Sequence, residues 1–217
     1  MSKAKTLIVF DIDDTLTKTA KMHQQFFVEA LEEIGVQEMD TNFGDYLHHT
    51  DSYIAACIYE KDKRSPFTAE VQQHFEALLY EKIRQQPIPE IRGARALLQN
   101  LQETAGSPAY CFATGSLYRP ALYKLKALGI STEEGQLVAS DQLRERENIV
   151  RKAIDLACKR QQLTAFDRVI ALGDGLWDLR AAQNLGIDFI GVGTKHRKLL
   201  LEEGAATVYE DLSKLCF

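Results

Sequence analysis

Short apolar runs alternate with helical patterns along most of this sequence, and few folds accommodate such an alternation. Four nearly continuous apolar runs lie at residues 7–10, 109–113, 169–172 and 189–192. Unbroken runs of this kind are typical of parallel strands buried on both faces. Apolar side chains at helical spacing mark residues 93–104, 117–128 and 145–160 between them. The alternation predicts an α/β fold, in which helices cover both faces of a parallel sheet.

One long segment, residues 17–86, interrupts the alternation. It contains no convincing strand, but its apolar residues recur at helical spacing from Met22 to Ile34 and from Val71 to Ile83. The chain has 217 residues, more than the ~150 of a usual domain, which favours one domain with a large insertion. We therefore expect a helical insertion at 17–86 within a core made of residues 1–16 and 87–217.

The insertion also carries signals for helix ends. Gly35 can end the first helix, and Thr68 is suited to cap the start of the last one. Asp51 can begin a shorter helix that runs through Ile58. The sequence Pro87-Ile88-Pro89 then ends the last helix and returns the chain to the sheet.

Composition excludes several classes of protein. The four cysteines are far apart and form no C-x-x-C pair, so we expect reduced, buried thiols rather than a zinc site or a disulfide framework. The net charge is −5 and the basic residues are scattered, which argues against nucleic acid as a partner. The longest apolar run, 53–59, is too short to span a membrane, and residues 1–5 are not followed by an apolar signal region. A soluble cytoplasmic protein is expected, as a monomer or a small homo-oligomer.

Polar and acidic residues follow three of the predicted strands. Asp11 and Asp13 end the first run, on the same side of an extended segment. Thr114-Gly115-Ser116 ends the second, and the third ends in a loop with Asp174 and Asp178. Ligands of open α/β sheets bind outside the carboxyl ends of the strands, so the three loops should converge on one crevice.

Each of these loops alone is typical of ordinary turns and helix caps. Together they would gather at least three acidic side chains, which repel one another unless a cation lies among them. Carboxylate oxygens without histidine or cysteine suit Mg²⁺, which commonly takes one or two carboxylates plus substrate phosphate.

The set of motifs resembles the haloacid dehalogenase superfamily. It comprises DxDxT at 11–15, Thr-Gly at 114–115, a basic residue opening a later helix, and GDGxxD at 173–178. More narrowly, it is similar to the Mg²⁺-dependent phosphatases with a helical cap between the first and second motifs. The resemblance spans about the whole chain and implies a Rossmann-like, three-layer parallel-sheet core with a small helical cap domain.

The resemblance also implies roles for individual residues. Asp11 matches the nucleophile that forms an aspartyl-phosphate, and Asp13 matches the general acid and base. The metal set would comprise Asp11, Asp13 through its main-chain carbonyl, Asp174, and Asp178 directly or through water. Thr114 and the Gly115 amide match donors to the phosphoryl oxygens, with Ser116 a weaker match.

The basic residue has three candidates, Arg144, Arg146 and Arg151. The pattern Arg146-Glu147-Asn148-Ile149-Val150, which opens the helix before the third strand, favours Arg146. A guanidinium there can hold a phosphate and the nucleophile with two hydrogen bonds. The alternative is a solvated arginine at a helix start.

The function that the motifs favour is hydrolysis of a phosphomonoester in a small phosphorylated metabolite. A phosphomutase uses the same two aspartates but returns the phosphoryl group to the substrate. A dehalogenase would leave Asp13, Asp174 and Asp178 unexplained, and phosphonate cleavage would need a reactive lysine such as Lys18 or Lys21. The substrate itself is not indicated, although residues 48–51 are candidates to face it.

A phospho-accepting regulatory domain is an alternative from a different class. It also places an acidic cluster, Mg²⁺, a threonine and a basic group on a parallel sheet. That hypothesis predicts a shorter chain, a nucleophile on a middle strand and no helical cap, and the sequence agrees with none of these. An inactive binding protein is disfavoured because every acid of the motifs is present.

Overall fold

The core of the computed structural model, which describes residues 5–217, is a parallel sheet of six strands in the order β3-β2-β1-β4-β5-β6. The strands are β1 (Thr6–Phe10), β2 (Ala109–Ala113), β3 (Leu137–Val138), β4 (Arg168–Gly173), β5 (Asp188–Val192) and β6 (Val208–Tyr209). The four apolar runs are β1, β2, β4 and β5, as predicted. The edge strands β3 and β6 were not predicted, because two residues are too few to give a pattern.

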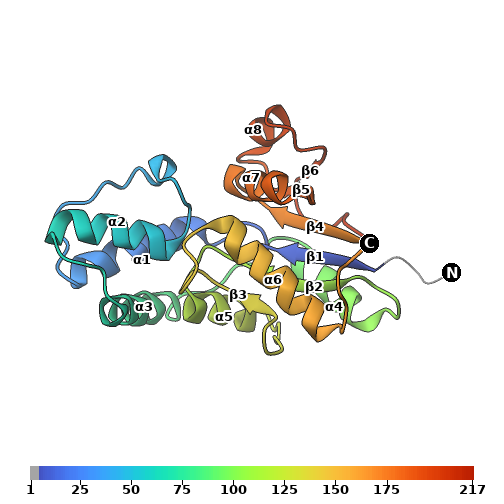
Figure 1. Cartoon of the computed structure of the whole chain (residues 1–217), viewed down its shortest axis with the longest axis horizontal. Coiled ribbons are helices and arrows are strands. Elements are labelled where there is room, and N and C mark those ends of the chain that lie inside the picture. Colours follow the sequence, from blue (N-terminus) through green and yellow to red (C-terminus); the bar gives the residue numbers. More distant parts are fainter. Residues whose placement is uncertain (1–4) are drawn as a thin grey trace.

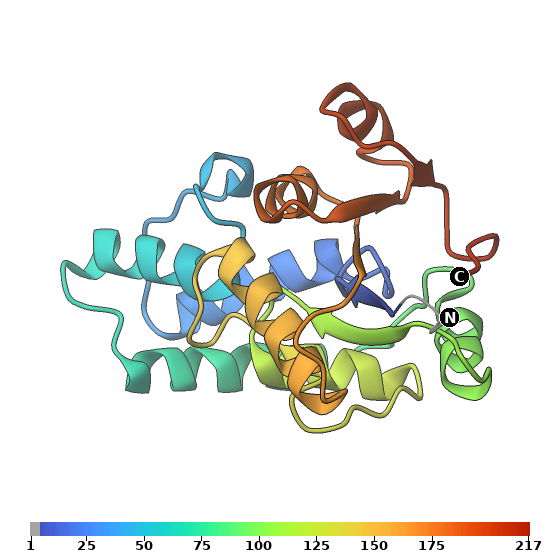
Figure 2. The same cartoon turned by 45° about the vertical axis from the view of Figure 1, so that its right-hand side comes forward.

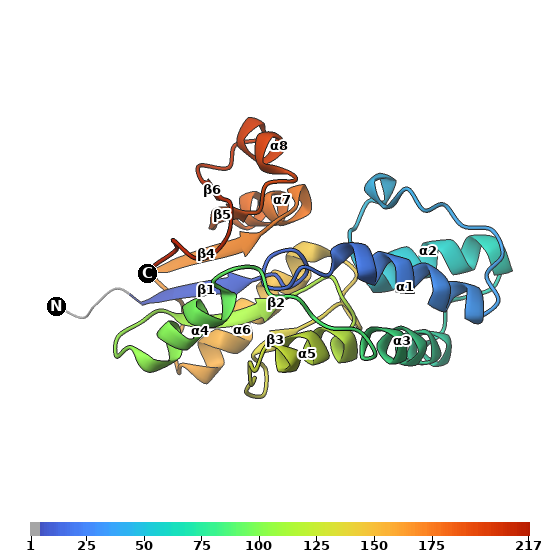
Figure 3. The same ribbon diagram turned by 180° about the vertical axis from the view of Figure 1, so that it is seen from behind.

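Helices cover both faces of this sheet, which confirms the α/β, three-layer core (Figures 1 and 3). The helices that follow the insertion are α4 (Ala94–Glu103), α5 (Tyr118–Ala127), α6 (Arg146–Arg160), α7 (Leu176–Leu185) and α8 (Arg197–Glu202). Strand β1 shows why both faces are apolar. Ile8 and Phe10 pack with α4 and α5, while Leu7 and Val9 pack with α6. No helix among residues 5–217 has the length and apolar character needed to cross a membrane.

The segment between β1 and α4 forms a helical insertion at the end of the sheet toward which β1 points (Figures 1 and 2). It contains α1 (Ala20–Glu33), the 3₁₀ turn η1 (Phe43–Asp45), α2 (Asp51–Lys63) and α3 (Ala69–Ile83). Its helices enclose an apolar core of their own, which includes Phe27, Phe75 and Leu79. The insertion is thus built to sit over the carboxyl ends of the strands.

The helix ends in the insertion follow the sequence signals. The Thr68 side chain accepts a hydrogen bond from the Val71 amide at 3.4 Å, as an N-cap does. Gly35 follows α1 with φ +89°, a conformation that favours glycine. Helix α2 runs to Lys63, past the expected end at Ile58. Its last turn is polar, so the apolar pattern underestimated its length.

The four cysteines are free, but the expectation that all are buried is wrong. Cys111 is buried in β2, Cys57 and Cys158 are half-buried on helices, and Cys216 is exposed near the chain end. A free cysteine packs well in a core but does not need one, and Cys216 lies beyond the last strand where no core surrounds it.

Candidate active site

The loops after β1, β2 and β4 meet at one cavity of about 130 Å³, between the sheet and the helical insertion. The lining residues from the core that the motifs pointed to are Asp11, Asp13, Thr114, Gly115, Ser116, Arg146 and Asp174. The insertion contributes the other wall. One cavity therefore combines carboxylates, a guanidinium and main-chain amides.

Asp11 lies at the end of β1 and is only 6% exposed. Its amide donates to the Leu172 carbonyl of β4 at 2.9 Å, which continues the sheet to this residue. Its carboxylate accepts hydrogen bonds from Thr15 Oγ1 at 3.2 Å and from Arg146 Nη2 at 2.5 Å. Burial raises the pKa of Asp11 to about 7, because the attraction of Arg146 does not fully offset it.

Arg146 is the first residue of α6, and it links two carboxylates. Besides Asp11, its Nε and Nη2 donate to Asp178 Oδ1 at 2.9 and 2.5 Å. Burial opposes the charge of the guanidinium, but Asp178 and Asp11 raise the pKa of Arg146 above its usual value. Arg144 and Arg151 are exposed. Of the three candidates, only Arg146 lies among the acids.

Asp11, Asp174 and Asp178 form an acidic cluster, with one carboxylate oxygen of each within 4.8 Å of the others. Burial and the neighbouring carboxylates raise the pKa of Asp174 well above its usual value. Asp174 accepts no hydrogen bond from residues 5–217. Three buried acids around one guanidinium leave an excess of negative charge, so the donor set fits a divalent cation that prefers oxygen.

The start of α7 places Asp178 in this cluster. The Gly175 amide donates to Asp178 Oδ2 at 3.2 Å, which turns the carboxylate back over the helix start. A side chain at Gly173 would collide with Asp178, so the chain needs glycine there for the carboxylate to approach. Gly173 therefore allows close packing against an acid, whereas a Cβ at Gly175 would collide with the Trp177 ring.

The turn after β2 presents donors to the cavity. Thr114 is buried, and its hydroxyl accepts a hydrogen bond from the Ser116 amide at 3.1 Å. The Gly115 amide donates no hydrogen bond to residues 5–217 and is free for a ligand. A Cβ at Gly115 would lie 2.5 Å from the His49 carbonyl oxygen and 2.9 Å from Arg146 Nη1. Glycine thus allows the insertion to approach this turn.

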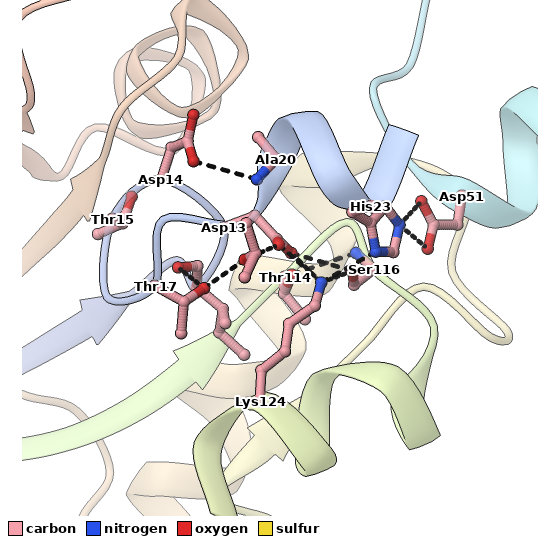
Figure 4. A network of polar contacts seen from close by, with 12 residues as sticks. Asp13, Asp14, Thr15, Thr17, Ala20, His23, Asp51, Thr114, Ser116 and Lys124 are labelled. Atoms are coloured by element: carbon pink, nitrogen blue, oxygen red, sulfur yellow. Dashed lines mark hydrogen bonds and ion pairs between the residues drawn. The ribbon is translucent and has the colours of Figure 1, made fainter. Parts of the chain in front are cut away.

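The carboxylate of Asp13 points toward Lys124 of α5 (Figure 4). Its oxygens lie 2.6 and 2.7 Å from Lys124 Nζ and accept hydrogen bonds from Thr19 Oγ1 at 2.5 Å and Ser116 Oγ at 3.1 Å. Burial alone would raise the pKa of Asp13, but the Lys124 ammonium and the hydrogen bond from Thr19 bring it well below its usual value. The expected contribution of Asp13 to a metal is its main-chain carbonyl and remains a prediction.

The insertion supplies much of the remaining cavity wall, to which Trp177 and Lys195 of the core also contribute. Of residues 48–51, the candidates to face a ligand, His49, Thr50 and Asp51 line the cavity. Further lining residues are His23, Gln24, Phe27, Phe43 and Ile54. Lys18 and Lys21 are exposed and do not line it, so neither is placed as phosphonate cleavage would require.

Sequence reasoning missed His23 and Lys124. Both are buried polar residues on otherwise apolar helix faces, His23 four residues before Phe27 and Lys124 three after Ala121. Their position on an apolar helix face could have identified them from the sequence, because a lysine on the buried face of a helix needs a partner in the interior.

A family model described as haloacid dehalogenase-like hydrolase matches residues 5–186. No curated protein matches the chain. A solved structure of a hydrolase from Pseudomonas syringae has 21% identity and a TM-score of 0.72, covering 98% of this chain and 96% of that one. CbbY from Rhodobacter sphaeroides in complex with phosphate has 19% identity and a TM-score of 0.68, covering 98% and 96%.

A putative beta-phosphoglucomutase from Bacteroides vulgatus is also similar, with 15% identity and a TM-score of 0.70. The match covers 97% of this chain and 85% of that one. At such identities these structures agree with the present one in fold. The family model matches most of the chain and therefore indicates its family, which these structures alone do not.

Proposed function

The chain belongs to the haloacid dehalogenase-like hydrolases, and we propose that it is a Mg²⁺-dependent phosphatase of a small phosphorylated metabolite. The observation that carries the proposal is the placing of Asp11. Its carboxylate is buried at a cavity, beside the Arg146 guanidinium and within 4.8 Å of the acids Asp174 and Asp178. A carboxylate held between positive charge and a metal site is suited to attack the phosphorus of an anionic ester.

The cavity contains hydrogen-bond donors that could bind the phosphoryl oxygens and carboxylates that could bind a metal. Arg146 and the free amide of Gly115 can donate to its oxygens, and the Thr114 hydroxyl can add a third hydrogen bond. Asp11, Asp174 and Asp178 would hold Mg²⁺, with the Asp13 carbonyl as a further ligand. When bound, Mg²⁺ neutralises charge on the nucleophile and on the phosphoryl oxygens.

In the first half of the proposed reaction, an Asp11 oxygen forms a bond to phosphorus while the bond to the leaving oxygen breaks. Asp13, which is anionic beside Lys124, first takes up a proton from solvent and then donates it to the leaving alcohol. In the second half, Asp13 accepts a proton from the water that attacks phosphorus, and the Asp11 carboxylate is released. An anionic Asp13 beside Lys124 is in the form that the second half requires.

We also propose that residues 17–86 act as a cap over a catalytic core of residues 1–16 and 87–217. The support is that helices α1 and α2 supply cavity-lining side chains such as Phe27 and Ile54. These side chains line the same cavity as Asp11 and Asp174, so the leaving group of a bound phosphomonoester would contact them. The cap would then select the substrate, while the core carries out the chemistry.

The test is a panel of phosphorylated metabolites and an aryl phosphate, assayed for inorganic phosphate with Mg²⁺ present. Steady release of phosphate that is lost in Asp11→Asn supports the proposal. A single stoichiometric phosphorylation of the protein would favour a regulatory domain instead. An absence of turnover with every phosphomonoester, by a protein shown to be folded and to bind Mg²⁺, would contradict the proposal.

A phosphomutase of the same superfamily is the second candidate, because putative beta-phosphoglucomutases are among the similar structures. It would use Asp11 and Asp13 in the same way but transfer the phosphoryl group back to the substrate. Conversion of a sugar phosphate to its isomer, faster than phosphate release, would identify this activity.

A further inference from the structure

Lys124 has an unusual place for a lysine, since its side chain has 0% exposure in the interior of the protein. It reaches from α5 toward the loop after β1, and its ammonium contacts three other side chains (Figure 4). Two of its contacts are with Asp13, at 2.6 and 2.7 Å; the others are His23 Nδ1 at 2.9 Å and Ser116 Oγ at 3.2 Å. A charge that is removed from water in this way persists only where its partners are fixed.

The contacts of Lys124 continue into the helical insertion. An ammonium has only donors, so it donates to His23 Nδ1, and His23 Nε2 carries the proton that it donates to Asp51. Both Asp51 oxygens lie 2.9 Å from His23 Nε2. The Asp51 carboxylate also accepts from the Leu117 amide at 3.0 Å, next to the Ser116 turn. A continuous chain of hydrogen bonds therefore joins α1, α2 and α5 to Asp13.

The Asp13 carboxylate is fixed by this chain rather than by the acidic cluster. Both of its oxygens are occupied, one by Lys124 and Thr19 and the other by Lys124 and Ser116. Asp13 lines the cavity, whereas Lys124 lies behind the cavity wall and would not touch a ligand there. Any effect of Lys124 on chemistry must pass through the residues that it holds.

We propose that Lys124 is a positioning residue for Asp13, whose carboxylate it fixes at the cavity and joins through His23 to Asp51 of the helical insertion. This inference rests on the phosphatase function proposed above, in which Asp13 transfers protons. A carboxylate displaced by about 1 Å can cost on the order of 100-fold in rate. Loss of the Lys124 ammonium would leave Asp13 with only two hydroxyl partners, free to leave its productive position.

The test compares Lys124→Met, which keeps the length and removes the charge, with Lys126→Met, which removes an exposed lysine from the same helix. Steady-state hydrolysis of an aryl phosphate gives kcat and KM for each. We expect Lys124→Met to lower kcat by about 10- to 100-fold with KM changed less than about threefold. Lys126→Met should match the wild type.

A double-mutant cycle separates positioning from structural damage. In the Asp13→Asn background, Lys124→Met should cause little further loss of kcat, because the group through which it acts is already gone. An equal loss in both backgrounds would overturn the inference, as would an unchanged kcat in Lys124→Met. If Lys124→Met does not fold, Asp51→Asn interrupts the same chain at its far end and should lower kcat without a matching rise in KM.

The same set of variants shows which proposal has failed. If Asp11→Asn and Asp13→Asn keep wild-type turnover, the proposed function is wrong. If both lose turnover while Lys124→Met and Asp51→Asn keep it, the proposed function stands and the positioning role of Lys124 does not.

Discussion

The imidazole of His49 stacks on the indole of Trp177, with ring centroids 4.5 Å apart and an interplanar angle of 21°. His49 precedes α2 in the helical insertion, and Trp177 lies in α7 between two residues of the acidic cluster. Next to this contact, the Asp51 amide donates to the Gly115 carbonyl at 2.8 Å, and Thr50 Oγ1 donates to the Arg144 carbonyl at 2.7 Å. The insertion is thus docked on the site through residues 49–51.

Gly115→Ala should weaken this docking. The added Cβ would lie 2.5 Å from the His49 carbonyl oxygen and 2.9 Å from Arg146 Nη1, so the segment before α2 must shift. Overpacking of this kind costs about 1–3 kcal/mol, and we expect kcat/KM to fall by roughly 10- to 100-fold in a folded protein. Gly44→Ala is the control, because its Cβ would meet nothing closer than 3.7 Å. Equal activity of the two variants would contradict the docking role of residues 49–51.

Asp11→Asn should abolish turnover and stabilise the metal-free protein at pH 8. The amide cannot attack phosphorus, but it removes a buried charge that lies close to Asp178 and Asp174. Mg²⁺ should still bind, more weakly, through the two remaining acids. Activity assays and thermal unfolding in EDTA measure the two effects. Turnover above a small fraction of the wild type would exclude Asp11 as the nucleophile.

Arg146→Ala should be the most damaging of three arginine substitutions. It leaves two buried carboxylates without their cation, which typically costs about 3–5 kcal/mol of stability, and it removes a donor for phosphate. Arg144→Ala and Arg151→Ala change exposed side chains and should shift stability by less than about 0.5 kcal/mol. Chemical denaturation and competitive inhibition by inorganic phosphate measure both effects. If one of the exposed arginines proves more important, the assignment of this motif is wrong.

Stabilisation by Mg²⁺ should grow as the pH rises from 6 to 8. The folded pKa of Asp11, about 7, lies above its ordinary 3.8, so between these values the folded state binds more protons than the unfolded state. Without metal, this group therefore lowers stability as the pH rises. Mg²⁺ must displace the proton below pH 7, which weakens its affinity by about tenfold per pH unit for each proton displaced.

The measurement is the rise in Tm on addition of Mg²⁺, at a series of pH values. Asp11→Asn is the matched control, since it has no proton to lose at that position and should show a weaker dependence on pH. A rise in Tm that is the same at pH 6 and pH 8 would contradict the coupling between Mg²⁺ and the protonation of the cluster.

The buried parts of the fold could be predicted from the sequence because burial leaves a pattern. Strands β1, β2, β4 and β5 are apolar on both faces, and α4, α5 and α6 each carry an apolar stripe. The short strands β3 and β6 and the six-residue helix α8 leave no such pattern, since their form depends on neighbours distant in sequence.

The residues of the site also fall into a group that could be predicted from the sequence and a group that could not. The acids and the Thr-Gly turn follow directly after strands, so their convergence is a consequence of the parallel sheet. Lys124 sits in the middle of an amphipathic helix, where a lysine is usually solvated. Its pairing with Asp13 spans 111 residues, and no local pattern encodes a contact of that kind.

Trp177 offers a direct optical test of the proposed metal site, because it is the only tryptophan in the chain. Its indole is half-buried, stacked on His49, and lies between the acids Asp174 and Asp178 in sequence. A cation bound to both acids should restrain the start of α7 and change the surroundings of the indole. We expect a saturable change of fluorescence on titration with Mg²⁺.

Two variants and a second cation serve as controls for this fluorescence titration. Asp174→Ala should remove the response, because it takes away the carboxylate that no protein group in residues 5–217 hydrogen-bonds. His49→Leu should change the starting fluorescence but keep the Mg²⁺ midpoint, since the imidazole contacts the indole and is no ligand in the cluster. Ca²⁺ should change the fluorescence without supporting turnover, because its larger and more flexible coordination shell misplaces the phosphate. A flat Mg²⁺ titration of an active enzyme would contradict the coupling between the metal and Trp177, and the roles of Asp174 and Asp178 would then rest on the variants alone.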